Sequence, residues 1–507
     1  MSIQRQPSLR IQWLLLIWCA AMVAGWFLYG PHIIDDSFIT FRYARNLGTG
    51  HGLVFQDGER VLGFSAPLWT LILSMAEFLG LSIPIAAVGL SYGSYAALAL
   101  LVFRIGCATN RRTSSFLTIA FLTISVFFYI LLASGMETML YTAVTTGLLL
   151  SVVTRRWRHV GALAGLAMFT RYDGLITVIV SLVFTLWLGG WRTALKQALI
   201  AAAIYLPWFL FSWGYYGSPI PQTIIAKKAV HYVDWSLLFK TYIPIYLSFQ
   251  PLWALWFAAA TWGGVTLARR DRAFAILPAW VLAFGGTFLA AKTAVPAFIW
   301  YLAPLYPIMF FLGVVGLEEL SAKLARWNIA RLLIPALLLL YHGYFFLQKA
   351  RTEGSSVIAR EEAYRQNAQV LNQFVKPGYK ILVGEVGTLG WYVRDATIID
   401  GYGLITPEVS TIRRENRAWM LQRGIPLHDH TDGTPEATLE MVRRFSPDVI
   451  TARDFYLCLS EGAMRDPLIK DHYVRLTAPE SNILSQATLV KKSLLPDLKG
   501  LQTKPIE

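Results

Sequence analysis

The stretch that decides the fold is WLLLIWCAAMVAGWFLYG (residues 13–30), followed at once by PHIIDDSFITFRYARNLGTGHG (residues 31–52). The first part is apolar over a length close to that of a transmembrane helix, roughly 17 to 25 residues. The second part begins with two adjacent aspartates and continues as an aromatic helix with two arginines. Together they predict an uncleaved first span, residues 11–29, that delivers a pair of carboxylates to the water boundary.

Composition extends this reading to most of the chain. The protein has 507 residues, of which 55% are hydrophobic and 15% charged, with a mean hydropathy of +0.48, so an ordinary soluble protein is excluded. We expect a polytopic α-helical membrane domain over residues 1–347 and an α/β domain over residues 348–507. The apolar runs predict about eleven crossings, at residues 11–29, 85–103, 116–132, 139–153, 160–170, 175–188, 198–213, 252–267, 273–291, 298–317 and 332–347.

The net charge of +14 comes largely from short basic clusters between apolar runs, which indicates the positive-inside pattern rather than a nucleic-acid surface. This pattern places the clusters in the cytoplasm and the aspartate pair outside, in the periplasm of a bacterium. To keep Arg104, Arg111 and Arg112 inside, residues 67–81 must form a helix in the outer interface and not a span. The first outer loop then covers residues 31–81, and the C-terminal domain lies on the same outer face.

Alternating helices and strands are predicted in the C-terminal domain. YKILVGEV (residues 379–386) and ATIIDGYG (residues 396–403) are typical of short buried strands, and TLEMVRRFSPDVIT (residues 438–451) of a helix that runs into a strand. Gly384, Gly387 and Gly390 have GxxGxxG spacing, which is not the dinucleotide-binding fingerprint, so turn or packing roles are expected.

The first outer loop holds the leading site candidates. A helix N-cap explains one aspartate of Asp35 and Asp36 but not both, because adjacent carboxylates repel unless a cation or metal shares the site. Arg42 and Arg45 lie three residues apart on one helix face, where an interfacial anchor and a role in a cleft are equally compatible with the pattern. His51, between two glycines, is more typical of a turn than of a ligand.

Further outward-facing polar residues extend the candidate site. Glu137 lies between two spans, where a carboxylate is costly without a partner. Arg171 and Asp173 are best explained as a mutual ion pair. Lys227 and Lys228 are predicted on the outer face, where the positive-inside rule makes lysines uncommon. They suit binding of an anionic group such as a phosphate, with lipid-headgroup anchoring as the alternative. A carboxylate base beside a phosphate-binding edge is what transfer of a sugar from a lipid phosphate requires.

At this point a series of motifs resembles a known family. DDSFITFRYARNLGTGHGLVF, ERVLGFSAPLW, GMETMLY, TRYDGL, YYGSPIPQTIIAKK, WYLAPLYP and IIDGYGL resemble, in this order, the signature blocks of GT-C class membrane glycosyltransferases. The nearest group is that of the mycobacterial terminal arabinofuranosyltransferase and its bacterial relatives. The resemblance spans most of the chain, from the first outer loop into the C-terminal domain.

The resemblance implies a GT-C fold with juxtamembrane helices in the first outer loop. It also implies inverting transfer of a sugar, such as the pentose arabinofuranose, from a polyprenyl-phosphate donor to a cell-envelope glycan or lipid at a periplasmic site. The acidic motif of such enzymes maps onto Asp35 as general base and Asp36 as its partner, which orients the acceptor or holds a cation. Two carboxylates could bind Mg²⁺ or Mn²⁺ but do not define a metal site. The blocks add substrate-binding candidates: Trp300, Tyr301, Asp400 and Tyr402.

The chain departs from its relatives at three of these blocks. Relatives usually have Arg-Tyr where this chain has Trp300 and Tyr301, and Pro-Glu where it has Tyr172 and Asp173. Gln222 replaces the usual asparagine. The missing arginine shifts the predicted phosphate contact to Lys227 and Lys228.

Three other functions compete with sugar transfer. A lipid-linked polysaccharide ligase or polymerase would share the substrates. A transporter would place its charges at the bilayer midplane, usually within internal repeats, and no repeat is visible. A non-catalytic assembly subunit would not need both Asp35 and Asp36.

Overall fold

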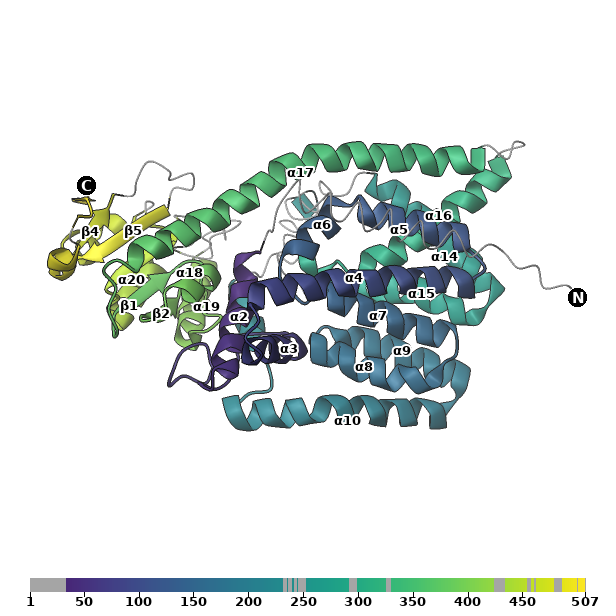
Figure 1. The fold of residues 1–507 in the computed structure, drawn as a ribbon, viewed down its shortest axis with the longest axis horizontal. Helices are drawn as coiled ribbons and strands as arrows, with labels where there is room; N and C mark the ends of the chain where they lie inside the picture. The colour runs from purple at the N-terminus through teal and green to yellow at the C-terminus, as the bar shows by residue number, and fades with distance from the viewer. Residues whose placement is uncertain are drawn as a thin grey trace, which may run out of the picture.

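The computed structural model describes residues 33–230, 252–290, 299–324, 330–423, 434–453, 457–459, 462–477, 486–498 and 500–506, together with 235, 239, 240 and 244. A bundle of long, roughly parallel helices makes up the larger part, and an α/β domain lies beyond one end of it (Figure 1). The predicted first span, residues 11–29, lies outside the described residues. The aspartate pair that follows it is described.

Most successive helices of the bundle run in opposite directions, but Arg112–Thr123 and Val126–Ala133 follow one another along the same direction (Figure 1). The bundle helices are α4 (Ile83–Ala108), α5 (Arg112–Thr123), α6 (Val126–Ala133), α7 (Thr138–Val153), α8 (Trp157–Thr170), α9 (Gly174–Gly189), α10 (Trp191–Tyr216), α14 (Trp253–Arg270), α15 (Ile276–Ala290) and α16 (Leu305–Leu324). Within the described residues, four helices are long and apolar enough to cross a membrane: Ile83–Ala108, Trp191–Tyr216, Arg272–Ala290 and Leu305–Lys323. Every predicted span after the first overlaps a described helix, but the count of eleven crossings stays a prediction.

Close helix packing in the bundle depends on glycine. A Cβ added to Gly263 of α14 would lie 1.9 Å from the carbonyl oxygen of Leu312, and one added to Gly316 of α16 would lie 1.9 Å from that of Ala259. Small residues let two backbones approach, which is a common way for helices to associate in a membrane. Nothing in the local sequence distinguishes these two glycines from the others in the bundle.

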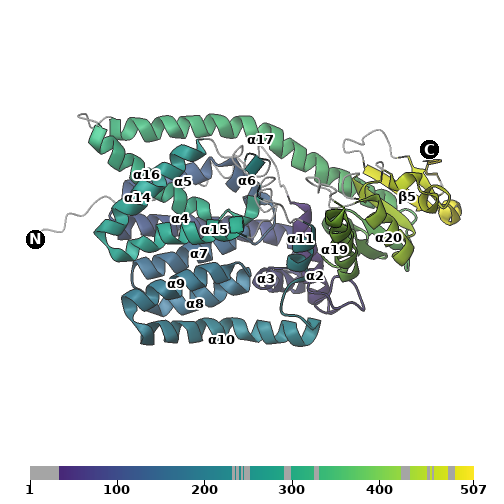
Figure 2. The same cartoon turned by 180° about the vertical axis from the view of Figure 1, so that it is seen from behind.

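Ion pairs gather where α4 meets α5, α7 meets α8 and α14 meets η2 (Arg272–Ala275), at the end of the bundle away from the α/β domain (Figure 2). Arg155 lies 2.7 Å from Asp271, and Arg270 lies 3.1 Å from Glu319, which also pairs with Arg111. The basic clusters therefore collect at one end of the bundle, as the positive-inside pattern predicts. Which side of a membrane this end faces stays a prediction.

One helix joins the two parts of the molecule. α17 (Ala330–Leu371) runs along the bundle and continues into the α/β domain (Figure 1). The predicted boundary between residues 347 and 348 lies inside this helix. The division into two domains therefore stays a prediction, and a continuous helix crosses the proposed border.

The α/β domain is built on a mixed six-stranded sheet with the order β2-β1-β3-β5-β4-β6. β1 pairs in parallel with β2 and β3, and the remaining neighbours are antiparallel. The strands β1 (Lys380–Val383), β2 (Thr397–Asp400) and β3 (Val449–Arg453) and the helix α20 (Pro435–Phe445) lie where the sequence predicts them. The other elements are α18 (Gly387–Tyr392), α19 (Pro407–Gln422), α22 (Pro467–Lys470), β4 (Tyr473–Leu476), β5 (Gln486–Lys491), β6 (Thr503–Lys504), η5 (Ala463–Arg465) and η6 (Lys492–Asp497).

The described part of the predicted first outer loop, residues 33–81, lies between the bundle and the α/β domain (Figure 1). It contains α2 (Asp35–Gly48) and α3 (Pro67–Phe78), so the helix predicted over residues 67–81 is present (Figure 1). Tyr43 and Phe55 from this loop share one apolar core with Ile381, Leu389 and Ile398 of the α/β domain. This shared core fixes the domain against α2 and so positions the two aspartates.

Candidate active site

Asp35 and Asp36 are the first two residues of α2. The preceding Ile34 has extended backbone and supplies no side-chain cap. Two carboxylates in the first turn suit the positive end of the helix dipole. Their side chains enter different surroundings, which we call the α18 contact (Asp35, Glu361, Gly387, Thr388) and the α11 cluster (Asp36, Glu137, Arg171, Asp173, Lys227, Tyr301).

In the α18 contact, Asp35 is held by backbone amides. Its carboxylate accepts the N–H groups of Gly387 at 3.0 Å and Thr388 at 2.6 Å, at the start of α18. The residue is only 7% exposed, and burial raises its pKa in spite of these hydrogen bonds. A Cβ added to Gly387 would lie 1.8 Å from the carbonyl oxygen of Asp35, so the close approach requires glycine. The packing role predicted for Gly387 is confirmed.

A second carboxylate completes the α18 contact. Glu361 of α17 accepts the backbone N–H of Asp35 at 3.2 Å and the Thr388 hydroxyl at 3.0 Å. Burial raises the pKa of Glu361 to about 7, although Arg360 lies 2.7 Å away. Glu361 is not among the site residues predicted from the sequence, and nothing in its local sequence marks it.

Arg42 and Arg45 fasten α2 to α18. Arg42 donates to the carbonyl oxygens of Phe55, at 2.7 Å, and of Gly390. The Arg45 guanidinium lies 4.1 Å from the centre of the Trp391 ring and donates to the Trp391 carbonyl. Both arginines are less than a tenth exposed. Both guanidinium groups are therefore engaged by partners in the loop after α2 and in α18.

His51 follows α2 and is not part of either group. Its ring nitrogen lies 3.5 Å from Asp57, and both side chains are more than half exposed. His51, Arg42 and Arg45 border a polar cavity of about 420 Å³ whose other wall includes Arg394.

The α11 cluster joins a carboxylate to two cations through one tyrosine. Lys227 on α11 (Gln222–Val230) places its amine 3.9 Å from Asp36 and 3.1 Å from the Tyr301 hydroxyl. The Tyr301 ring, in η4 (Ile299–Tyr301), also lies 4.8 Å from the Arg171 guanidinium. Asp36 remains about a third exposed. It is the more accessible carboxylate of the pair.

Arg171 is anchored on both sides. It lies 2.9 Å from Glu137 and 3.0 Å from Asp173, so the predicted ion pair with Asp173 is present. Glu137 is 4% exposed and would be costly there without this partner. The two acids stand at the starts of α7 and α9. The pair fixes Arg171 against Tyr301.

The remaining predicted residues lie beside this cluster or farther from it. Lys228 is exposed on α11, and Trp300, whose ring centre lies 6.2 Å from that of Tyr301, packs against the apolar core of the bundle. Asp400 is the buried last residue of β2 and accepts the N–H groups of Tyr402 at 2.8 Å, Leu404 and Ile405. Burial raises the pKa of Asp400 to about 6. This aspartate shapes a turn, and Tyr402 lies beneath Arg413.

Metal ligands are sparse around the aspartate pair. Among the described residues, no group of three or more His, Cys, Asp or Glu side chains could hold a metal ion. Both carboxylate oxygens of Asp35 already accept backbone hydrogen bonds. The described residues therefore offer no all-protein ligand set for Mg²⁺ or Mn²⁺ at this pair, and participation of a divalent cation stays a prediction.

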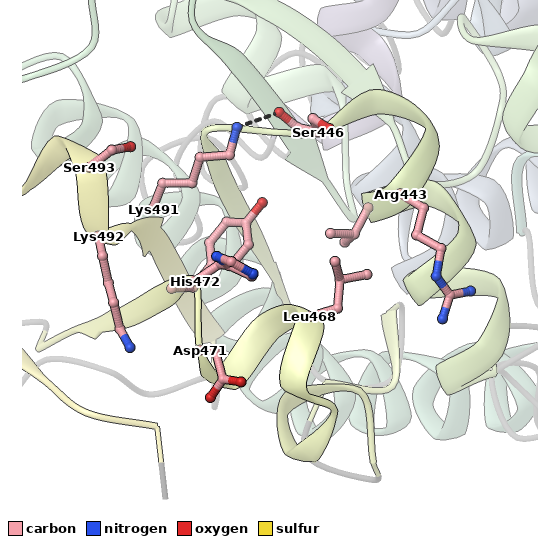
Figure 3. A pocket seen from close by; sticks show the side chains of 10 residues that line it. Arg443, Ser446, Leu468, Asp471, His472, Lys491, Lys492 and Ser493 are labelled. Atoms are coloured by element: carbon pink, nitrogen blue, oxygen red, sulfur yellow. Dashed lines mark hydrogen bonds between the residues drawn. The ribbon is translucent and has the colours of Figure 1, made fainter.

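Another hollow, of about 460 Å³, lies on the α/β domain between α20, α22 and β5 and contains none of the predicted residues (Figure 3). Lys491, on its wall, donates to the carbonyl of Ser446 at 2.7 Å and lies 3.1 Å from Asp448. Its charge is thus already balanced within the domain.

Known proteins share both sequence and shape with this chain. A 245-residue segment is 26% identical to the terminal beta-(1->2)-arabinofuranosyltransferase of Mycobacterium tuberculosis, covering 43% of this chain and 39% of that relative. The match thus spans well under half of the curated relative. Residues 355–489 match a family described as a domain of unknown function (DUF8728).

Solved structures match over nearly the whole chain. ArnT from Cupriavidus metallidurans aligns with a TM-score of 0.61 at 15% identity, covering 98% of this chain and 100% of that one. The same protein bound to undecaprenyl phosphate aligns with a TM-score of 0.59 at 15% identity, covering 96% and 99%. The oligosaccharyltransferase of Archaeoglobus fulgidus, tethered to an acceptor peptide, gives 0.55 at 13% identity, covering 92% and 73%.

The chain has the GT-C glycosyltransferase fold. The resemblance inferred from the motifs is confirmed, and in this GT-C fold the block DDSFITFRYARNLG forms α2 and the block TIIAKK forms most of α11. The two blocks lie about 190 residues apart in sequence, yet they bring Asp36 and Lys227 together.

Proposed function

We propose that this protein is an inverting glycosyltransferase that moves a sugar from a polyprenyl-phosphate donor to a cell-envelope glycan or glycolipid. The observation that carries the proposal is the α11 cluster, in which Asp36 lies 3.9 Å from Lys227 and remains partly exposed. An acceptor needs a base, and a departing phosphate needs a cation. The α11 cluster offers one of each.

In the proposed reaction Asp36 acts on the acceptor. Its carboxylate takes the proton of the acceptor hydroxyl, whose oxygen forms a bond to the anomeric carbon of the donor sugar. The bond from that carbon to the phosphate oxygen breaks, and its electron pair leaves with the polyprenyl phosphate. Lys227 stabilises the charge on that phosphate, while Arg171 holds the Tyr301 ring that positions Lys227.

This proposal exchanges the roles assigned from the sequence. Asp35 was expected to be the base, but its two carboxylate oxygens accept backbone N–H groups and it is buried. We therefore assign Asp35 to positioning, because it ties the start of α2 to α18. The partly exposed Asp36 is free to meet an acceptor.

The donor and the location follow the relatives. The structure of ArnT bound to undecaprenyl phosphate supports a lipid-phosphate carrier, and the mycobacterial relative supports arabinofuranose as the first sugar to test. We place the site on the periplasmic face of a bacterial inner membrane, with the α/β domain on that side. The supporting observation is that the basic clusters lie at the opposite end of the bundle.

The test is a donor panel. Purified full-length protein is incubated with decaprenyl- and undecaprenyl-phosphate sugars and a mixture of short envelope glycans, and released polyprenyl phosphate and new glycosides are detected by mass spectrometry. We expect release from one donor by the wild type and none by Asp36→Asn. Release that Asp36→Asn retains would contradict the site, and solute flux through proteoliposomes without any release would favour a transporter.

A further inference from the structure

A separate groove runs along the bundle between α4, α7 and the start of α8. It encloses about 1010 Å³ and shares no residue with the α18 contact or the α11 cluster. On α4 its lining extends from Gly89 to Ala108. A helix rises about 1.5 Å per residue, so this stretch is roughly 28 Å long, close to the roughly 30 Å hydrocarbon thickness of a bilayer. The groove therefore has the length of a site for a lipid chain.

Two glycines keep the groove open. A Cβ added to Gly89 or Gly93 would meet no atom within 4 Å, unlike one added to Gly263 or Gly316, which would collide with a neighbouring helix. Glycine inside a helix costs about 1 kcal/mol relative to alanine, so its presence calls for a reason. Here it leaves room for something that is not part of the bundle.

Two arginines stand at one end of the groove without acidic partners. Arg104 and Arg156 line this end beside His159, whose ring accepts a hydrogen bond from Arg158, and no Asp or Glu side chain lines the groove. Within the described part of the chain, Arg104 and Arg156 form no ion pair, whereas the nearby Arg111 and Arg155 both do. Two unpaired arginines and an apolar channel match a ligand with one anionic end and one apolar end.

We propose that this groove binds an anionic phospholipid, with its phosphate between Arg104 and Arg156 and an acyl chain along α4 past Gly93. Basic pockets between transmembrane helices bind acidic lipid headgroups in this manner. A second copy of the chain packed symmetrically here would bring the same cations face to face, which disfavours that occupant. The inference does not depend on the sugar-transfer reaction.

The test measures lipid retention by the full-length protein in detergent. Delipidated protein is titrated with phosphatidylglycerol, phosphatidylethanolamine or undecaprenyl phosphate, and bound lipid is counted by native mass spectrometry. We expect phosphatidylglycerol to bind and the double variant Arg104→Gln with Arg156→Gln to weaken it roughly thirtyfold, at about 1 kcal/mol per cation. Gly93→Leu should block the groove without touching a charge.

Matched controls separate the site from general effects. Arg192→Gln with Lys196→Gln removes two exposed cations on α10, outside the groove, and Gly286→Leu adds bulk to an exposed position of α15 with open space. Both controls should bind as the wild type does. Equal loss in the controls, equal binding of phosphatidylethanolamine, or no retained lipid would overturn the proposal. Preference for undecaprenyl phosphate, or loss that follows a dimer mass, would replace the phospholipid by that occupant.

Discussion

The α18 contact and the α11 cluster begin at neighbouring residues, yet they differ in how their charges are satisfied. In the α18 contact, Asp35 is closed off by two backbone amides and lies beside a second buried carboxylate, Glu361. In the α11 cluster, Asp36 faces a lysine across 3.9 Å and keeps contact with solvent. The first arrangement holds a domain in place, and the second leaves a carboxylate available for chemistry.

The difference also explains why the chain has two aspartates and not one. An aspartate that anchors α18 is poorly placed to receive a proton from an acceptor, since each of its oxygens already accepts a backbone N–H group and the residue is buried. Because Asp35 and Asp36 both lie at the start of α2, their positions are coupled. Any shift of α18 moves the helix end that carries Asp36. Domain docking and catalysis would then depend on the same helix turn.

The strongest test of this comparison exchanges each carboxylate for an amide. We expect Asp36→Asn to lower kcat by roughly a hundredfold to ten-thousandfold, the usual contribution of a general base, with unchanged thermal stability. Asp35→Asn should lower the free energy of unfolding by about 1 to 3 kcal/mol, because its NH₂ group would face a backbone N–H. Turnover assays measure kcat, and thermal unfolding measures stability, for both variants. A stable but inactive Asp35→Asn beside an active Asp36→Asn would return the base to Asp35.

Gly387→Ala should disrupt the packing of α18 on Asp35 without changing a charge. The added methyl group would lie 1.8 Å from the carbonyl oxygen of Asp35, so α18 must move away from α2. Overpacking usually costs about 1 to 3 kcal/mol, and a clash with backbone belongs at or above the top of that range. Thermal unfolding checks the cost, with Gly343→Ala on α17 as control because its Cβ would meet nothing within 4 Å. Equal stability of the two variants would show that α18 does not pack on Asp35.

The buried carboxyl of Glu361 predicts a pH effect. Its pKa lies near 7 in the folded protein and near 4.5 when unfolded, so the folded state binds more protons between these values. Stability should therefore fall as pH rises through this window, by up to about 3 kcal/mol. Asp35, whose pKa is also raised, acts in the same direction. Unfolding midpoints from pH 5 to 8 measure the slope.

Glu361→Gln should flatten that slope, because the amide does not titrate. The neighbouring Glu362 is only partly buried and its pKa is lowered by a hydrogen bond from Arg365, so Glu362→Gln should leave the slope intact. A slope that survives in Glu361→Gln would assign it to other groups.

Much of this organisation could be predicted from local sequence. Apolar runs predict the helices of the bundle, short β-rich runs predict β1 and β2, and close spacing predicts the pair of Arg171 with Asp173. Signature blocks single out Asp36 and Lys227. These features depend on the periodicity of neighbouring residues or on motifs a few residues long.

The division of labour between the aspartates could not be predicted in this way. It depends on Glu361, Gly387 and Thr388, which lie 326 to 353 residues from Asp35 in sequence. Arg42 and Arg45 illustrate the same limit. Their spacing places them on one helix face, but only the position of α18 shows that this face meets backbone carbonyls and not lipid or substrate.

The two lysines of α11 provide the smallest and most specific test. Lys227 is largely buried between Asp36 and Tyr301, whereas Lys228 is exposed. A charge-assisted hydrogen bond to a phosphate contributes about 1.5 to 3 kcal/mol, so Lys227→Gln should raise the KM for the lipid donor roughly tenfold to a hundredfold. Lys228→Gln should change it less than about twofold, since exposed charges contribute little. Steady-state kinetics with donor and acceptor varied separately distinguish the outcomes. If both substitutions raised the donor KM equally, phosphate would be bound by the surface charge of α11. The assignment of Lys227 as the specific contact of the departing phosphate would then be wrong.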